Sequence, residues 1–493
     1  MSFVNYCVLA ISFLVPALLL CKKKHDYLIF WIGLTLIIEI FNSLSLISIT
    51  ATKMTGLVLL PYAIQNFSKI YATRPGKILT GLTCFFVTLG ILYGFVFPWP
   101  DVTGVRSIRY LSQGRSVLYL GTYFLELIVV VYLGTQLRKK ENFHALYMGL
   151  VFGSILSGFG LILEKFCHFD FFYYFTGWDP RPLSIRPRGF NYEPRGAGYS
   201  TAVGLLMLLL PFLKFDLKTR ALFMLVVYYG FHLAASVSGI FLMIVGIPTL
   251  IYFFWSFRKL YTEDYRLFLK SLQILGLIIF AFNMRYIPLP TFQWYKKGGD
   301  QTVRQRQTAW EYSIESKKVE YVDSEGWMSK FEPFDSATLA FFADHPAQLL
   351  IGTGPGLISL PASYYRTIDS LPHIGLLLQI SNYGLVGLFL WFTMILAMFK
   401  NLLRCDLTDL DNRNKLALFI FLIPLYSLQA KVIYIIALGL GFASYFQMDA
   451  QLTTKIHPSS DLIPDHSPEL GWISTEKLGL GYRSTSPKVS IPL

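Results

Sequence analysis

Long apolar runs are the feature that most constrains what this chain can fold into. A helix needs about 20 apolar residues to cross the hydrocarbon core of a bilayer, and the sequence carries about thirteen runs near that length. Because the core of a bilayer admits only helices and closed barrels, the runs predict an all-α integral membrane protein, a polytopic bundle of about 12–13 transmembrane helices. The expected spans are roughly 3–21, 27–48, 53–71, 78–97, 115–135, 144–164, 196–213, 219–235, 238–256, 267–283, 374–399, 414–430 and 432–448.

The composition and charge of the chain agree with this class. Hydrophobic residues make up 54% of the 493 residues and charged residues 15%, whereas soluble domains are about 25% charged. The net charge of +13 does not by itself indicate nucleic-acid binding, because membrane proteins collect Lys and Arg in their cytoplasmic loops. The five cysteines form no CxxC pair, and no cluster of His, Cys or Asp has metal-ligand spacing. We therefore expect no disulfide framework, no metal and no cofactor.

The positions of the basic residues predict the topology. Lys and Arg follow every odd-numbered run up to the eleventh, beginning with three lysines directly after the first, and cytoplasmic loops are the basic ones. This pattern places the N-terminus outside and makes two long connections external, roughly 165–195 and roughly 284–373. We therefore expect a bundle over 1–448 that includes both external loops. The tail over 449–493 is rich in Ser, Pro and Thr, and we expect it to be cytoplasmic and disordered.

The second external loop ends in a Gly-rich stretch that leads into a membrane helix. Gly352, Gly354 and Gly356 stand close together with one proline, a density that no helix or central strand tolerates. The stretch therefore predicts a fixed irregular loop. His373 follows it and marks the start of an apolar helix. Five glycines are expected to shape this region, namely Gly352, Gly354, Gly356, Gly384 and Gly387.

The end of the first external loop is basic. Arg181, Arg186, Arg188 and Arg195 surround Glu193 in this segment, on the side of the membrane where an excess of positive charge is not expected. The planar fork of a guanidinium group suits phosphate oxygens, so a diphosphate is a natural ligand. Contacts with lipid headgroups, or ion pairs with Asp and Glu, are the alternatives.

Two motifs resemble one family of bacterial membrane enzymes. His345-Pro346 followed by the GTGPG loop, then His373 and the Gly384/Gly387 pair, resembles the signature of O-antigen polymerases and O-antigen ligases. The segment GFNYEPR, residues 189–195, resembles the polymerase branch. The resemblance implies a GT-C-like bundle with a large extracytoplasmic loop. It also implies an inner-membrane glycosyltransferase that uses polyprenyl-diphosphate-linked oligosaccharides, with its active site facing the periplasm.

The resemblance also implies roles for individual residues. His373 or Glu193 would deprotonate the acceptor hydroxyl, since an imidazole or a carboxylate can act as a general base. Neutralising the charge that grows on the departing diphosphate would stabilise the transition state without a metal. The arginines expected to do so are Arg186, Arg188, Arg195, Arg306 and Arg366.

Three functions stay open on the sequence. A polymerase, which transfers glycan to a hydroxyl of another lipid-linked unit, is favoured because Ile374 stands where ligases usually carry Asn. Its partners would be the lipid-linked oligosaccharide, the bilayer, a chain-length regulator and a flippase, and no nucleic acid. A ligase acting on lipid A–core or another surface acceptor is the first alternative. A transporter of lipid-linked oligosaccharides is the second, favoured by Glu39 and Glu126 at membrane depth.

Overall fold

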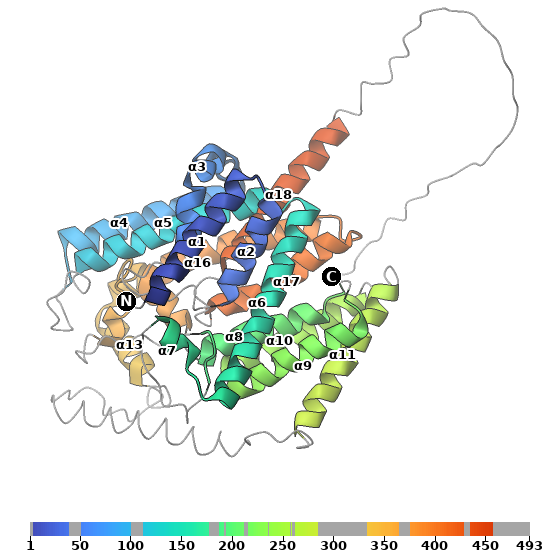
Figure 1. Cartoon of the computed structure of the whole chain (residues 1–493). Coiled ribbons are helices and arrows are strands. Elements are labelled where there is room, and N and C mark those ends of the chain that lie inside the picture. The colour runs from blue at the N-terminus through green and yellow to red at the C-terminus, as the bar shows by residue number, and fades with distance from the viewer. Residues whose placement is uncertain are drawn as a thin grey trace, which may run out of the picture. The chain divides into compact units, whose positions relative to one another are not determined.

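A computed structural model gives the fold of the chain (Figure 1). Within the residues that it describes, every regular element is a helix, and six helices are long and apolar enough to cross a membrane. Helices of the length and apolar composition needed to cross a membrane are thereby confirmed, whereas the count of about 12–13 helices and the GT-C-like arrangement stay predictions. The six helices are Arg74–Val96, Ser112–Gln136, Lys140–Cys167, Gly239–Ser256, Thr262–Phe282 and Leu376–Arg404. The described residues are 3–38, 51–99, 112–176, 187–191, 194–211, 215–234, 236–256, 258, 262–283, 333–363, 375–427 and 434–456.

The helices follow the predicted runs closely along most of the chain. The run predicted at 144–164 lies inside α6, and the run predicted at 267–283 lies inside α11. In chain order the elements are α1 (Phe3–Cys21), α2 (His25–Ile37), α3 (Ala51–Ala72), α4 (Arg74–Ile91), the π-helix η2 (Leu92–Val96), α5 (Ser112–Gln136), α6 (Lys140–Cys167), α7 (Phe171–Thr176), α8 (Pro194–Leu209), α9 (Leu217–Ala234), α10 (Val237–Ser256), α11 (Thr262–Asn283), α13 (Pro333–Asp344), α14 (Pro346–Ile351), α15 (Leu360–Ser363), α16 (Gly375–Arg404), α17 (Leu410–Ser427) and α18 (Tyr434–Ile456).

The chain divides into two units, Met1–Asp449 and Ala450–Leu493. The first unit holds the helical bundle. The last helix, α18, continues past residue 448, where we predicted that the final apolar run ends. The rest of the predicted tail lies outside the described residues, and so do residues 284–332 of the second external loop.

Small residues set how closely the helices of the bundle approach one another. A Cβ added to Gly33 of α2 would lie 2.8 Å from the carbonyl oxygen of Leu146 in α6. A Cβ added to Gly230 of α9 would lie 2.5 Å from the Cα of Gly158, also in α6. Glycine lets helix backbones touch in a membrane, where packing rather than a hydrophobic driving force holds helices together. Because of these contacts, α6 packs directly against both α2 and α9.

The helix that follows the Gly-rich loop is not continuous, contrary to the expectation of one apolar helix. Gly384 has φ 64 and ψ −177, which interrupts α16. The first segment of α16 therefore ends shortly before Gly384, and the longer second segment runs to Arg404. Sequence hydropathy misses the break because both segments are apolar.

Candidate functional site

The segment that carries Arg188 lies along one face of α6. The side chain of Asn191 donates a hydrogen bond to Ser157 Oγ at 2.9 Å. The ring of Phe190 covers Gly160, where an added Cβ would lie 2.6 Å from the ring. The four α6 positions that receive the segment are Ser157, Gly160, Leu161 and Glu164. Their spacing places them on one helix face, so α6 presents a continuous stripe on which the loop is fixed.

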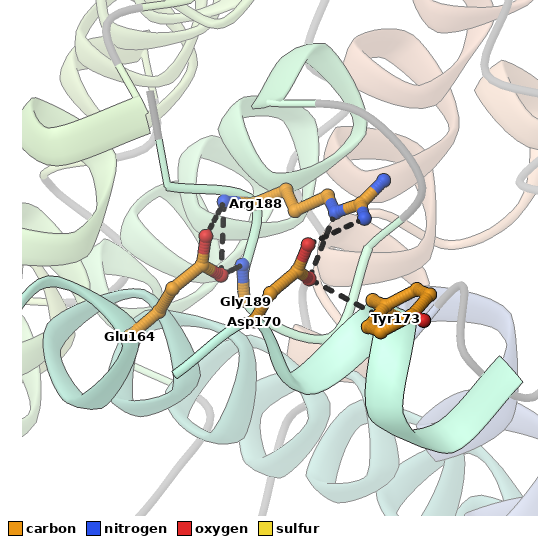
Figure 2. Close-up of polar contacts among 5 residues, drawn as sticks. All are labelled: Glu164, Asp170, Tyr173, Arg188 and Gly189. Atoms are coloured by element: carbon orange, nitrogen blue, oxygen red, sulfur yellow. Dashed lines mark hydrogen bonds and ion pairs between the residues drawn. The ribbon is translucent and has the colours of Figure 1, made fainter. Parts of the chain in front are cut away.

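Glu164 fixes the backbone of this segment. Its carboxylate accepts hydrogen bonds from the backbone N–H of Arg188, at 3.2 Å to each oxygen, and from the backbone N–H of Gly189 (Figure 2). Gly189 has φ 58, and a Cβ there would lie 2.9 Å from the nitrogen of Leu161. Only glycine lets the loop approach α6 this closely. Glu164 is 6% exposed, so its carboxyl oxygens are hydrogen-bonded to backbone donors rather than to water.

Asp170 holds the guanidinium group of Arg188. The Nε of Arg188 donates to Oδ1 of Asp170 at 3.1 Å, and Nη2 donates to Oδ2 at 2.7 Å (Figure 2). Oδ1 also accepts the backbone N–H of Tyr173 at 3.1 Å, in the first turn of α7. The guanidinium carbon lies 4.8 Å from the centre of the Phe172 ring. Arg188 is 1% exposed and Asp170 7% exposed. The two residues therefore form a buried, bidentate ion pair, which is among the stronger hydrogen-bonded contacts in proteins.

The charged groups around Arg188 do not add up to an excess of positive charge. One guanidinium group, that of Arg188, lies beside two buried carboxylates, Glu164 and Asp170. Both backbone N–H groups that could form an anion cradle, at Arg188 and Gly189, already donate to Glu164. The described residues therefore form a rigid support for the basic segment. Any excess of positive charge at this place has to come from the neighbouring arginines.

The Gly-rich loop is a second fixed structure, and it fills the break in α16. Gly352, Gly354 and Gly356 all have positive φ. The backbone N–H of Thr353 donates to the carbonyl oxygen of Ser381 at 2.7 Å, and its hydroxyl lies 2.8 Å from the same oxygen. The last carbonyls of a helix lack partners within the helix, so Thr353 caps the first segment of α16 at the break.

The same loop packs on α5 and on the end of α4. The hydroxyl of Ser116 donates to the carbonyl oxygen of Pro355 at 3.1 Å, and Arg115 Nη1 donates to Ser359 Oγ at 2.6 Å. Pro355 also packs on α4, since a Cβ added to Gly90 would lie 2.9 Å from its Cγ. The loop thus joins α4, α5 and α16.

The Gly-rich loop and the Arg188 segment lie at the same end of the bundle. The Gly-rich loop packs on the start of α5, and the Arg188 segment packs on the last turns of α6. A turn over 137–139 joins α5 to α6, and Lys139 N–H donates to the carbonyl oxygen of Gln136 in that turn at 3.1 Å. Both helices are long and apolar enough to cross a membrane, and a membrane that both cross has the start of α5 and the end of α6 on the same side.

The other predicted site residues fall mostly outside the described part of the chain. Arg195 lies in the first turn of α8, and the position of its side chain is not described. Gly387 lies inside the second segment of α16, against Tyr383. Those outside the described residues are His373, Glu193, Arg186, Arg306 and Arg366, and also Glu39. Their roles stay predictions.

Sequence reasoning did not single out Glu164 and Asp170, the two carboxylates that contact the Arg188 segment. The spacing of Ser157, Gly160 and Glu164 on α6 was a usable signal, because small and acidic residues aligned on an apolar helix predict a polar partner. No comparable signal marks Asp170, which stands alone in an aromatic segment. Among the residues that the structure describes, no group of three His, Cys, Asp or Glu side chains could hold a metal ion.

No protein-family model matches the chain, and no curated protein or solved structure matches it either. The membership of the O-antigen polymerase and ligase family stays a prediction from the motifs.

Proposed function

We propose that the chain is a membrane glycan transferase of the O-antigen polymerase type. It moves an oligosaccharide from a polyprenyl diphosphate to a hydroxyl of another lipid-linked unit at the outer face of a bacterial inner membrane. The observation that supports this best is that Glu164 fixes the backbone of the segment carrying Arg188 on α6. A simple lipid-headgroup anchor needs no such rigidity, whereas a group that must meet a leaving diphosphate gains from being held in place.

The chemistry of the proposal needs no nucleotide and no metal, because a polyprenyl diphosphate is already an activated leaving group. The acceptor oxygen attacks the anomeric carbon as the bond to the diphosphate breaks. Arg188, Arg195 and the other predicted arginines neutralise the charge that grows on the diphosphate. His373 or Glu193 takes the proton of the acceptor hydroxyl. A single displacement of this kind inverts the anomeric centre.

The test is chain lengthening with purified components. The full chain in nanodiscs is mixed with a defined lipid-linked repeat unit, and the products are sized on a gel. We expect a ladder with the natural sequence, and loss of the ladder with Arg195→Ala and with His373→Ala. Arg266→Ala is the matched control, because Arg266 is exposed and pairs with Glu263 on the surface of α11. A full ladder from both site variants contradicts the proposal.

A gene deletion separates a polymerase from a ligase. Loss of a polymerase leaves surface glycan with a single repeat on its core acceptor. Loss of a ligase leaves the core without glycan, while lipid-linked polymer accumulates. The first pattern is the one expected here.

A transporter is the second candidate, and the break in α16 favours it. Discontinuous membrane helices are common in transporters, and Gly384 interrupts α16. A carboxylate also lies within the bundle, where the hydroxyl of Tyr434 donates to Oε2 of Glu126 at 2.6 Å. In proteoliposomes, a transporter should move a fluorescent lipid-linked oligosaccharide across the bilayer, and Glu126→Gln should stop it. Chain lengthening without such movement argues for the transferase.

A further inference from the structure

The geometry points to Asp170 as an exchangeable partner of Arg188, which a diphosphate group displaces when it binds. This inference rests on the proposed function, since it concerns the arginine segment of the same site. In the structure, Asp170 occupies the Nε–Nη2 edge of the guanidinium group. In the bound protein, two phosphate oxygens take that edge, and α7 is released from Arg188.

The backbone of the segment and its guanidinium group are held by different elements. The backbone is fixed on α6, through Glu164 and through the hydrogen bond between Asn191 and Ser157. The guanidinium group is fixed by Asp170, just before α7. Figure 2 shows this division, with Glu164 facing the backbone and Asp170 facing the side chain of Arg188. Arg188 can therefore change its partner while the segment stays in place on α6.

A carboxylate and a phosphate group compete for the same edge of an arginine. Two parallel N–H···O bonds suit the oxygen spacing of both groups. The distances of 3.1 Å and 2.7 Å show that Asp170 uses this arrangement fully. A diphosphate brings more negative charge to the guanidinium group than one carboxylate does. The exchange therefore favours the ligand once it reaches the site.

The connection between α6 and α7 allows Asp170 to move. His168 ends α6 with φ 52 and ψ 40, a left-handed conformation that is uncommon for a residue other than glycine. The helix α7 has only six residues. The side chain of Tyr174 is 57% exposed, whereas Phe172 is fully buried beside the guanidinium group of Arg188 and has to leave it when α7 moves. A short helix after such a turn is a suitable moving element.

When Arg188 is released, the carboxylate of Asp170 is buried without a cation, and this free-energy cost is removed only if Asp170 moves to water. A buried carboxylate without its cation is strongly unfavourable, and Asp170 is buried together with Glu164. Asp170 therefore has to reach water when the guanidinium group turns to the ligand. Binding of a diphosphate is in this way coupled to an outward shift of α7, which opens the site only when the ligand is present.

The test is the affinity of the full chain in nanodiscs for farnesyl diphosphate, measured by calorimetry. Asp170→Asn keeps the shape of the side chain but removes its charge. We expect it to bind about tenfold more tightly than the natural sequence, since the competing partner is weakened. Arg188→Lys should bind about tenfold more weakly, because a lysine cannot form the two-pronged contact. Farnesol, which lacks the diphosphate, is the matched control and should show no dependence on either residue.

The outcomes separate the displacement of Asp170 from the proposed role of Arg188 in the transferase. If Arg188→Lys weakens binding but Asp170→Asn weakens it too or leaves it unchanged, the exchange is wrong and Arg188 still binds the diphosphate. If the natural sequence does not bind farnesyl diphosphate, or Arg188→Lys binds it equally well, the proposed role of Arg188 in the transferase fails as well.

A second measurement uses the natural sequence alone, so it does not depend on how the variants fold. The backbone N–H of Tyr173 donates to Asp170. Farnesyl diphosphate should therefore speed hydrogen exchange in 171–176 while exchange at Gly189 stays slow. If hydrogen exchange in 171–176 becomes slower or stays unchanged, the proposal that the diphosphate displaces Asp170 from Arg188 is wrong.

Discussion

Gly352 and Gly384 lie backbone against backbone, so the loop that carries one fills the helix break that carries the other. A Cβ added to Gly352 would lie 2.6 Å from the amide nitrogen of Gly384, and one added to Gly384 would lie 2.5 Å from that of Gly352. Gly352 has φ 81 and ψ 176, and Gly384 has φ 64 and ψ −177. Residues with a side chain essentially never adopt this conformation. The Gly-rich loop and the break in α16 are therefore one interlocked feature.

The first prediction concerns this interlock. Replacing Gly352 by Ala should lower the free energy of unfolding by about 3 kcal/mol, because backbone strain adds to the overlap of the new Cβ with α16. The measurement is unfolding of the purified protein in mixed micelles. Gly384→Ala should cost a similar amount, and the double variant should cost less than the sum, since both substitutions disturb one contact.

A matched control for the interlock lies at Gly81 in α4. A Cβ added there meets nothing within 4 Å, and alanine is a better helix former than glycine. Gly81→Ala should leave the free energy of unfolding unchanged or raise it by up to about 1 kcal/mol. Equal losses from Gly81→Ala and Gly352→Ala would show that the contact between Gly352 and Gly384 is not specific.

The helical class of this fold could be predicted from the sequence, but the break at Gly384 could not. Apolar runs predict membrane helices because the bilayer imposes their length. The clustered glycines around Gly354 predict an irregular loop, since no regular element accommodates them. A single glycine inside an apolar run is usually tolerated in a helix, so Gly384 carries no local signal for a break. The break is visible only with Gly352 beside it, which is a tertiary contact.

The candidate site was predicted less completely than the fold. The basic character of the loop around Arg188 is visible in the sequence, and the ion pair was kept open there as an alternative to phosphate binding. Which carboxylates would pair with it was not visible, because Glu164 and Asp170 come from a helix end and from an aromatic segment. Chain folding brings them together over distances that periodicity does not reveal.

The second prediction concerns the hydroxyl of Ser157. Ser157→Ala should lower the free energy of unfolding by about 1–2 kcal/mol, because the buried hydrogen bond from the Asn191 amide to the Ser157 hydroxyl is lost. Ser154→Ala is the matched control one turn earlier on α6. Ser154 is equally buried, but its hydroxyl has no hydrogen-bond partner among the described residues. Its removal should cost nothing, and a larger loss at Ser154 than at Ser157 would contradict the assigned hydrogen bond.

The third prediction concerns Glu164. Glu164→Gln replaces one acceptor oxygen by a donor that faces backbone N–H groups, so the segment around Arg188 should loosen. Because hydrogen bonds to charged groups contribute about 1.5–3 kcal/mol, we expect a loss of about 2 kcal/mol in the free energy of unfolding. Hydrogen exchange at Gly189 should become faster as well.

The control for Glu164 is Glu141→Gln in the first turn of the same helix, where the side chain is exposed. It should change neither quantity. Under the proposed function, Glu164→Gln should also shorten the glycan ladder, and Glu141→Gln should not. Unchanged exchange at Gly189 in Glu164→Gln would show that the carboxylate does not hold the segment.

The fourth prediction concerns Arg220, a fully buried residue of α9 that closes the end of α8. Its Nη1 donates to the carbonyl oxygen of Leu208 at 2.6 Å and to that of Leu210 at 2.9 Å. Arg220→Met keeps the apolar stem but leaves both carbonyl groups without this donor, so the free energy of unfolding should fall by about 3 kcal/mol.

Lys218→Met, at an exposed position one half-turn away, is the matched control and should change the free energy of unfolding by less than about 0.5 kcal/mol. Unfolding in mixed micelles measures both variants, and an equal effect of the two would mean that Arg220 acts only through its charge near the membrane surface and not as the cap of α8.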